Sequence, residues 1–140
     1  MNGFLLDTNI LSETRKKKPD ANVQTWLESQ PMYVQHLSVI TLGELLQGAH
    51  RARSPELRAN LQGWLERIEQ RFEGRVLVLD ADVMRVWASI TANAITRGLT
   101  PPLMDSLLAA TAIHHDLIFV TRNTDDVQAL GVRTLNPWLT

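Results

Sequence analysis

Carboxylate and amide side chains follow apolar segments, or open one, at four places in this 140-residue chain. In an open parallel α/β sheet, ligands bind at the carboxyl ends of the strands, so side chains that are distant in sequence can share a site at this edge. A set of oxygen ligands without cysteine or suitably spaced histidine predicts a hard divalent cation such as Mg²⁺ or Mn²⁺. The candidate ligands are Asp7, Glu44, Asp105, Asn123 and Asp126.

Such a cluster would support a particular reaction class. Carboxylates within about 5 Å of one another raise one another's pKa and destabilise the fold unless a cation or protons intervene. One or two metal ions can lower the pKa of a water, orient it toward a phosphorus atom and neutralise the charge on the leaving oxygen. Phosphodiester hydrolysis is therefore the reaction class that fits the cluster best.

The apolar segments that position these residues alternate with helical patterns. This alternation predicts βαβ units, and hence an α/β fold with a parallel sheet and helices on both faces. The expected strands cover residues 3–6, 34–40, 76–79, 117–121 and 132–135. The expected helices cover residues 8–14, 21–29, a segment from 41 onward, 55–72, 83–98 and 104–115.

Each acidic residue also has a structural explanation when it is taken alone. Asp7, Asp105 and Asp126 could be helix N-caps, which contribute about 1 kcal/mol each. Glu44 could form a capping box with Thr41, three residues before it. Four independent caps have no reason to lie at the same sheet edge, so the joint pattern favours a shared site.

The length and composition of the chain exclude several classes of protein. The length and the 44% hydrophobic content fit a single domain over residues 1–140. With a net charge of −1, any nucleic acid would have to meet a local basic patch. The absence of cysteine excludes disulfides and thiol chemistry. No apolar stretch reaches the roughly 18 to 20 residues of a membrane span, and the N-terminus lacks a signal-peptide pattern, so we expect a cytoplasmic protein without a membrane partner.

Four sequence blocks together resemble the PIN-domain ribonucleases, and more narrowly the FitB and VapC toxins of bacterial toxin–antitoxin pairs. The ending at residues 135–138 is similar to that of FitB toxins. The likeness runs from residue 3 to about residue 138, in the order and spacing of the family. The blocks are Gly3–Glu13, Leu37–Gly48, Pro102–Ala112 and Val120–Asp126.

The resemblance implies a Mg²⁺-dependent endoribonuclease that acts as a toxin, with Mn²⁺ as an alternative ion. Asp7, Glu44 and Asp105 would hold the metal and activate water, on a three-layer fold with a five-stranded parallel sheet between helices. It also implies a homodimer and a small antitoxin protein that blocks the site. The substrate would be RNA, with tRNA as one candidate, and operator DNA would be bound only through the antitoxin.

The fourth acidic position departs from the commonest family pattern. Many family members carry an aspartate where this chain has Asn123, whereas others have asparagine there and an aspartate three positions later, which Asp126 matches. The resemblance therefore assigns the fourth place to Asp126, with Asn123 in support, and leaves a second metal ion open.

Basic and hydroxyl side chains near the blocks are further candidates. A cationic patch beside the metal would bind RNA phosphates, although a solvated helix end explains part of it equally well. Thr8 and either Ser38 or Thr41 could orient metal waters, with helix capping as the alternative role. No role is assigned to Trp138. The candidate RNA-binding residues are Arg15, Lys16, Lys17 and Arg122.

Two rival functions remain at this stage. One is a catalytically silent PIN-like interaction module, although Asp7, Glu44 and Asp105 are all present. The other is a Mg²⁺-dependent phospho-acceptor or phosphatase. A receiver domain would require a lysine after the last strand, and residues 132–140 contain none. A haloacid-dehalogenase-like site would require a second aspartate at the position that Asn9 occupies. Both observations count against this second function.

Overall fold

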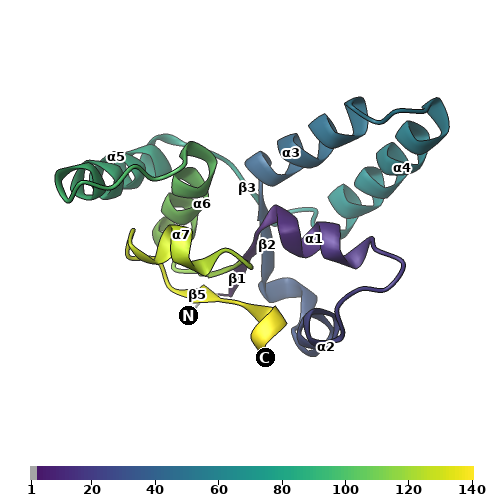
Figure 1. Cartoon of the computed structure of the whole chain (residues 1–140), viewed down its shortest axis with the longest axis horizontal. Coiled ribbons are helices and arrows are strands. Elements are labelled where there is room, and N and C mark those ends of the chain that lie inside the picture. The colour runs from purple at the N-terminus through teal and green to yellow at the C-terminus, as the bar shows by residue number, and fades with distance from the viewer. Residues whose placement is uncertain (1–2) are drawn as a thin grey trace.

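Five parallel strands form the central sheet, and the first strand of the chain lies in its middle (Figure 1). The structure is a computed structural model that describes residues 3–140; Met1 and Asn2 lie outside the described part of the predicted domain. All four pairings are parallel, which confirms the predicted α/β fold. In the order β3-β2-β1-β4-β5, the strands are β3 (Val76–Leu77), β2 (Gln35–Ser38), β1 (Phe4–Leu6), β4 (Ile118–Val120) and β5 (Thr134–Leu135).

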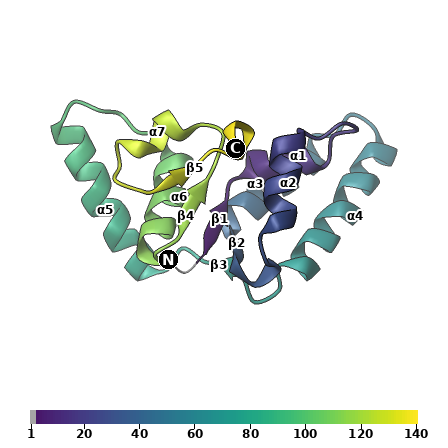
Figure 2. The ribbon, with the colours of Figure 1, turned by 90° about the horizontal axis from the view of Figure 1, so that it is seen from below.

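Helices connect the strands and cover both faces of the sheet. The α-helices are α1 (Thr8–Thr14), α2 (Ala21–Ser29), α3 (Val39–His50), α4 (Pro55–Arg71), α5 (Ala81–Thr96), α6 (Leu103–His114) and α7 (Thr124–Gln128). Two 3₁₀ turns are η1 (Met32–Val34) and η2 (Pro137–Leu139). Figure 2 shows α5, α6 and α7 on one side of the sheet and α1 to α4 on the other.

Alternating side chains of β1 divide the core into two clusters. Phe4 and Leu6 pack with residues of α1, α2 and α4, whereas Leu5 packs with residues of α5, α6 and α7. This is the alternation expected of a strand that is buried on both faces. The rings of Phe4 and Trp26 meet edge to face, with centroids 4.9 Å apart. Because β1 is anchored on both faces, the residue that follows it has a fixed position.

The N-termini of α3 and α6 are capped differently from the prediction. Helix α3 begins directly after β2, at Val39, and the Ser38 hydroxyl accepts from the Ile40 amide at 3.0 Å. The predicted capping box of Thr41 and Glu44 is therefore wrong, because Thr41 already lies inside the helix and is fully buried. Asp105 is no N-cap either, since α6 begins after Pro102 without a side-chain cap.

Asp126 also lies inside a helix rather than at its cap. Asn123 is the N-cap residue of α7, and Asp126 is in the first turn.

The strands expected at residues 76–79 and 132–135 are shorter than predicted, because only Val76–Leu77 and Thr134–Leu135 are strand residues. Among the helices of the described residues, none combines the length and the apolar character that a membrane span requires.

The glycine before β1 yields a stability prediction. Gly3 has φ of 131°, and an alanine Cβ there would collide with the carbonyl oxygen of Val34. We expect Gly3→Ala to lower the free energy of unfolding by about 2–4 kcal/mol, measured by urea denaturation. Gly74→Ala is the matched control: its φ is 79°, but nothing lies within 4 Å of the added atom, so it should cost only about 1 kcal/mol. Equal effects of the two variants would contradict the packing account.

Candidate active site

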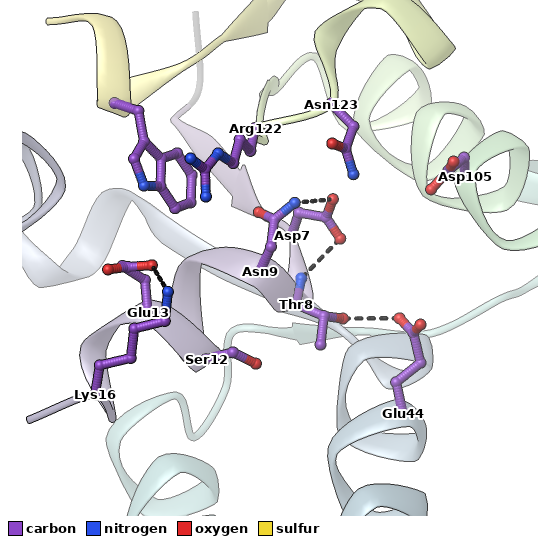
Figure 3. A pocket seen from close by; sticks show the side chains of 11 residues that line it. Asp7, Thr8, Asn9, Ser12, Glu13, Lys16, Glu44, Asp105, Arg122 and Asn123 are labelled. Atoms are coloured by element: carbon purple, nitrogen blue, oxygen red, sulfur yellow. Dashed lines mark hydrogen bonds and ion pairs between the residues drawn. The ribbon is translucent and has the colours of Figure 1, made fainter. Parts of the chain in front are cut away.

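An open cavity of about 410 Å³ lies at the carboxyl edge of the sheet (Figure 3). Its walls come from α1 and the turn that follows it, from α3, from the start of α6, from the segment after β4 and from the C-terminal turn η2. The residues that line it are Asp7, Thr8, Asn9, Ser12, Glu13, Lys16, Glu44, Asp105, Arg122, Asn123 and Trp138.

Asp7 is the most firmly held carboxylate of this cavity. One oxygen, Oδ1, accepts from the Thr8 amide at 2.7 Å, so Asp7 does cap α1. The other, Oδ2, accepts from the Thr121 hydroxyl at 2.7 Å and from the side-chain amide nitrogen of Asn9, Nδ2, at 3.3 Å. Parallel pairing of Leu6 with Val120 brings Asp7 beside Thr121. The capping role and the cavity position therefore coexist in one side chain.

Burial makes the Asp7 carboxylate costly to ionise. Burial is the largest influence and raises the pKa of Asp7 above 3.8, against the lowering effect of the Thr121 and Thr8 hydrogen bonds. The charges of Asp105 and Glu44 raise the pKa of Asp7 further. These electrostatic effects link three carboxylates from three separate segments: the N-cap of α1, helix α3 and helix α6.

A side-chain hydrogen bond joins Glu44 to α1. The Thr8 hydroxyl donates to Glu44 Oε1 at 2.7 Å, which ties the start of α1 to α3. Thr8 Oγ1 also lies 3.4 Å from the Thr41 hydroxyl oxygen. Thr8 thus lines the cavity and holds Glu44, so a role in orienting metal waters stays a prediction for Thr8.

Asp105 reaches the cavity from the first turn of α6. The following residues, from Ser106 to Ala112, are all buried, which fixes the helix against the sheet. Burial raises the pKa of Asp105, and the charges of Asp126 and then Glu44 raise it further. Helix α6 also directs the positive end of its dipole at this carboxylate.

The structure places the two candidates for the fourth position differently. Asn123 lines the cavity, and its backbone amide donates to the Thr121 hydroxyl oxygen at 3.1 Å. Asp126 lines a separate hollow with residues 99–102, although its charge still acts on Asp105. The assignment of the fourth ligand to Asp126 is untested, and of the two candidates Asn123 is the one that lines the cavity.

The predicted basic residues divide into two groups. Lys16 and Arg122 line the cavity. Arg15 faces another hollow, with its guanidinium carbon 5.6 Å from the centre of a Trp64 ring, and Lys17 is exposed outside the cavity lining.

Ser38, predicted to orient metal waters, does not line the cavity. It is fully buried, and its hydroxyl caps α3.

Several cavity residues were not identified from the sequence. Asn9 holds Asp7 from two residues further along the chain. Thr121, which does not itself line the cavity, holds Asp7 only because β1 pairs with β4, and no local pattern encodes that pairing. Glu13 is buried and binds the Lys16 ammonium at 2.8 Å. The hydrogen bond from Lys16 is the main reason that the pKa of Glu13 is lowered.

The donor set fits a hard divalent cation. Carboxylates of Asp7, Glu44 and Asp105 and the amide of Asn123 offer oxygen atoms to one cavity. Asn9 Oδ1, on the same wall, is buried without a hydrogen-bond partner within residues 3–140. Oxygen ligands of this kind are those that Mg²⁺ and Mn²⁺ prefer.

A second acidic group lies elsewhere on the molecule. Ligand atoms of Asp80, Asp82 and His114 lie within 4.8 Å of one another, but all three residues are exposed. Asp80 caps α5 by accepting from the Val83 amide, and Asp82 pairs with Arg85 at 2.6 Å. His114 is nine residues after Asp105 on α6, a distance of about 14 Å along the helix. This group is therefore separate from the cavity.

The raised pKa of Asp105 predicts that its charge destabilises the metal-free fold. Because the folded state binds the proton more tightly, this penalty is present at neutral pH and disappears as pH falls through the raised pKa. Asp105→Asn should therefore raise the free energy of unfolding in EDTA by about 0.5–1 kcal/mol at pH 7. The gain should shrink toward pH 4.

Urea denaturation with and without Mg²⁺ measures this effect. Added Mg²⁺ should stabilise the parent more than Asp105→Asn. Asp82→Asn is the control. This exposed carboxylate forms an ion pair with Arg85, so its loss should not raise the free energy of unfolding. A destabilised Asp105→Asn variant at pH 7 would contradict the electrostatic account.

A family model described as PIN domain matches residues 4–130. The VapC ribonuclease Y4jK of Sinorhizobium fredii is 36% identical over 136 residues, which cover 96% of this chain and 97% of that protein. Toxin FitB of Neisseria gonorrhoeae is 36% identical over 139 residues, covering 96% and 98%. The crystal structure of FitAcB from the same organism superposes with a TM-score of 0.94 at 36% identity, covering 98% of this chain and 99% of that one. The chain therefore belongs to the PIN-domain family, and within it is similar to the VapC and FitB proteins.

Proposed function

We propose that this chain is a Mg²⁺-dependent endoribonuclease and the toxin of a toxin–antitoxin pair, built as a single domain over residues 1–140. The observation that carries the proposal is the convergence of Asp7, Glu44 and Asp105 on one cavity at the sheet edge. The similarity to proteins named ribonuclease and toxin supports the reaction class and the biological role. Mn²⁺ is the alternative ion.

The chain's own residues prepare the cavity for the ion. Thr121, Asn9 and the Thr8 amide fix the Asp7 carboxylate, and the Thr8 hydroxyl fixes Glu44. Asp105 is held by the buried helix α6. When bound, Mg²⁺ would supply charge neutralisation and a water acidic enough to act as a nucleophile near neutral pH.

The other end of the cavity suits a polyanion. Lys16 and Arg122 border it, opposite the carboxylates of Glu44 and Asp105 (Figure 3). Charge-assisted hydrogen bonds from such side chains to phosphate oxygens would make RNA binding dependent on salt. The cavity is open rather than enclosed. An endonuclease requires this, because the RNA strand must extend on both sides of the phosphodiester bond that is cleaved. The RNA substrate, with tRNA as one candidate, would be recognised through unpaired nucleotides.

Partners follow from the resemblance to toxins of toxin–antitoxin pairs. A small antitoxin protein would cover this cavity, and operator DNA would be bound only through the antitoxin. A homodimer is the proposed assembly of the toxin itself. The similarity to the FitAcB structure over nearly the whole chain supports a partner of the same kind.

Loss of one central carboxylate should abolish cleavage. Asp105→Asn keeps the size of the side chain but removes the charge that attracts the cation, so we expect the rate of RNA cleavage to fall about 100-fold or more. The assay is Mg²⁺-dependent cleavage of total RNA and of tRNA by the purified protein freed of co-purified partners. EDTA should have the same effect on the parent.

Asp82→Asn is the matched control, since it removes an exposed carboxylate outside the cavity. Full activity in Asp105→Asn would contradict the assignment of the site. A folded parent protein that binds Mg²⁺ but cleaves no RNA would instead favour the catalytically silent interaction module.

The placement of Asn123 in the cavity gives a second test. We expect Asn123→Ala to weaken Mg²⁺ binding about tenfold, and Asn123→Asp to strengthen it, because a carboxylate adds charge at the cavity wall. Asp126→Asn should have a smaller effect, since Asp126 lies outside the cavity lining. Isothermal titration with Mn²⁺ or Mg²⁺ measures all three. The reverse order of effects would assign the fourth ligand to Asp126.

A further inference from the structure

The C-terminal turn η2 holds Arg122 at two points. The Asn136 side-chain amide donates to the Arg122 carbonyl oxygen at 3.3 Å. The Arg122 guanidinium carbon lies 4.9 Å from the centre of a Trp138 ring, within the range of a cation–π contact. Arg122 is otherwise exposed, and Figure 3 shows it at the border of the cavity. Both its backbone and its charged group are therefore located by the last residues of the chain.

Trp138 is itself fixed by the surrounding structure. Asn136 Oδ1 accepts from the Trp138 amide at 3.0 Å, and the Asn22 side chain donates to the Trp138 carbonyl oxygen at 2.9 Å. Pro137 is buried, and the indole packs against the core cluster beneath α1 and α2. The Thr121 amide donates to the Leu135 carbonyl, which joins this segment to β4. The ring is thus a rigid support rather than a mobile tail.

The Arg122 guanidinium keeps its donors available for a ligand. Stacking on an aromatic face uses none of the N–H groups of an arginine. Within residues 3–140, no carboxylate lies at ion-pair distance from this guanidinium. Glu13, whose pKa the charge of Arg122 helps to lower, is already bonded to Lys16 and the Asp20 amide. A positioned and unpaired cation at the cavity is suited to an oxyanion.

We propose that Trp138 is a positioning residue, which with Asn136 holds the Arg122 guanidinium so that it binds the RNA phosphate next to the one that is cleaved. This inference rests on the proposed ribonuclease function. Arg122 borders the cavity away from Glu44 and Asp105, so the phosphate it binds is a neighbour of the one at the carboxylates (Figure 3). Because Trp138 packs against the core cluster and carries the Arg122 guanidinium on its ring, we assign it this positioning role rather than that of a base-stacking platform.

Steady-state cleavage of an RNA that the parent cleaves separates binding from chemistry. Trp138→Leu should raise KM about two- to fivefold and leave kcat unchanged, the range expected for loss of an exposed cation–π contact. Arg122→Gln should raise KM at least as much. The double variant should equal Arg122→Gln, because Trp138 acts only through the arginine. Trp138→Phe should retain most of the parental KM.

Two further variants protect the test against a folding defect. Asn136→Ala leaves both the indole and the guanidinium in place but removes the bonds that align them, so it should also raise KM. Leu139→Ala, in the same turn and 83% exposed, should change nothing. In addition, the NMR signal of the Arg122 Nε–H should be shifted by the ring current in the parent and in Trp138→Phe, and unshifted in Trp138→Leu.

The outcomes are distinct. Additive effects of Trp138→Leu and Arg122→Gln on KM would mean that Trp138 contacts RNA itself and would overturn the positioning role. An unchanged KM in Trp138→Leu, or an effect on kcat alone, would also overturn it. If the parent cleaves no RNA, the proposed function fails and the phosphate contact with it. The NMR signal would still report whether Trp138 positions Arg122.

Discussion

The burial and repulsion of carboxylates gathered in one cavity is the constraint on which this structure depends. Burial raises the pKa of Asp7 and of Asp105, and the charge of Glu44 raises the pKa of both further, so these ionised side chains in isolation destabilise the sheet edge. The fold opposes this with specific contacts: two hydroxyls, one side-chain amide and one backbone amide hold Asp7 and Glu44. A cation that removes the repulsion would be bound by ligands whose positions are already set.

The position of Asp7 follows from the central strand. Both faces of β1 are buried, so it cannot shift without disrupting two core clusters. Its register with β4 brings Thr121 to Asp7, and the next residues carry Arg122 and Asn123 to the cavity. One strand pairing therefore places a carboxylate, the hydroxyl that orients it, and an amide and a cationic side chain that line the same cavity.

Much of this arrangement could be predicted from the sequence. Alternating apolar segments predict the five strands, and the rule that ligands bind at the carboxyl edge brings Asp7, Glu44 and Asp105 together. Local patterns failed where tertiary geometry decides. Thr41 and Glu44 have capping-box spacing, yet β2 passes into α3 so early that Ser38 takes the cap. The run from Arg15 to Lys17 looks like one basic patch, but in the turn after α1 Arg15 packs on Trp64 and only Lys16 of the three lines the cavity. The contact of Trp138 with Arg122 joins residues whose proximity depends on β5 and the final turn, which no motif describes.

Anomalous diffraction from crystals soaked in Mn²⁺ tests the central claim most directly, because it locates the ion without relying on a substrate. The account predicts a peak within coordination distance of Asp7, Glu44 and Asp105, and its loss in Asp105→Asn. A peak confined to the exposed group of Asp80, Asp82 and His114, or no peak in the cavity at saturating Mn²⁺, would contradict it.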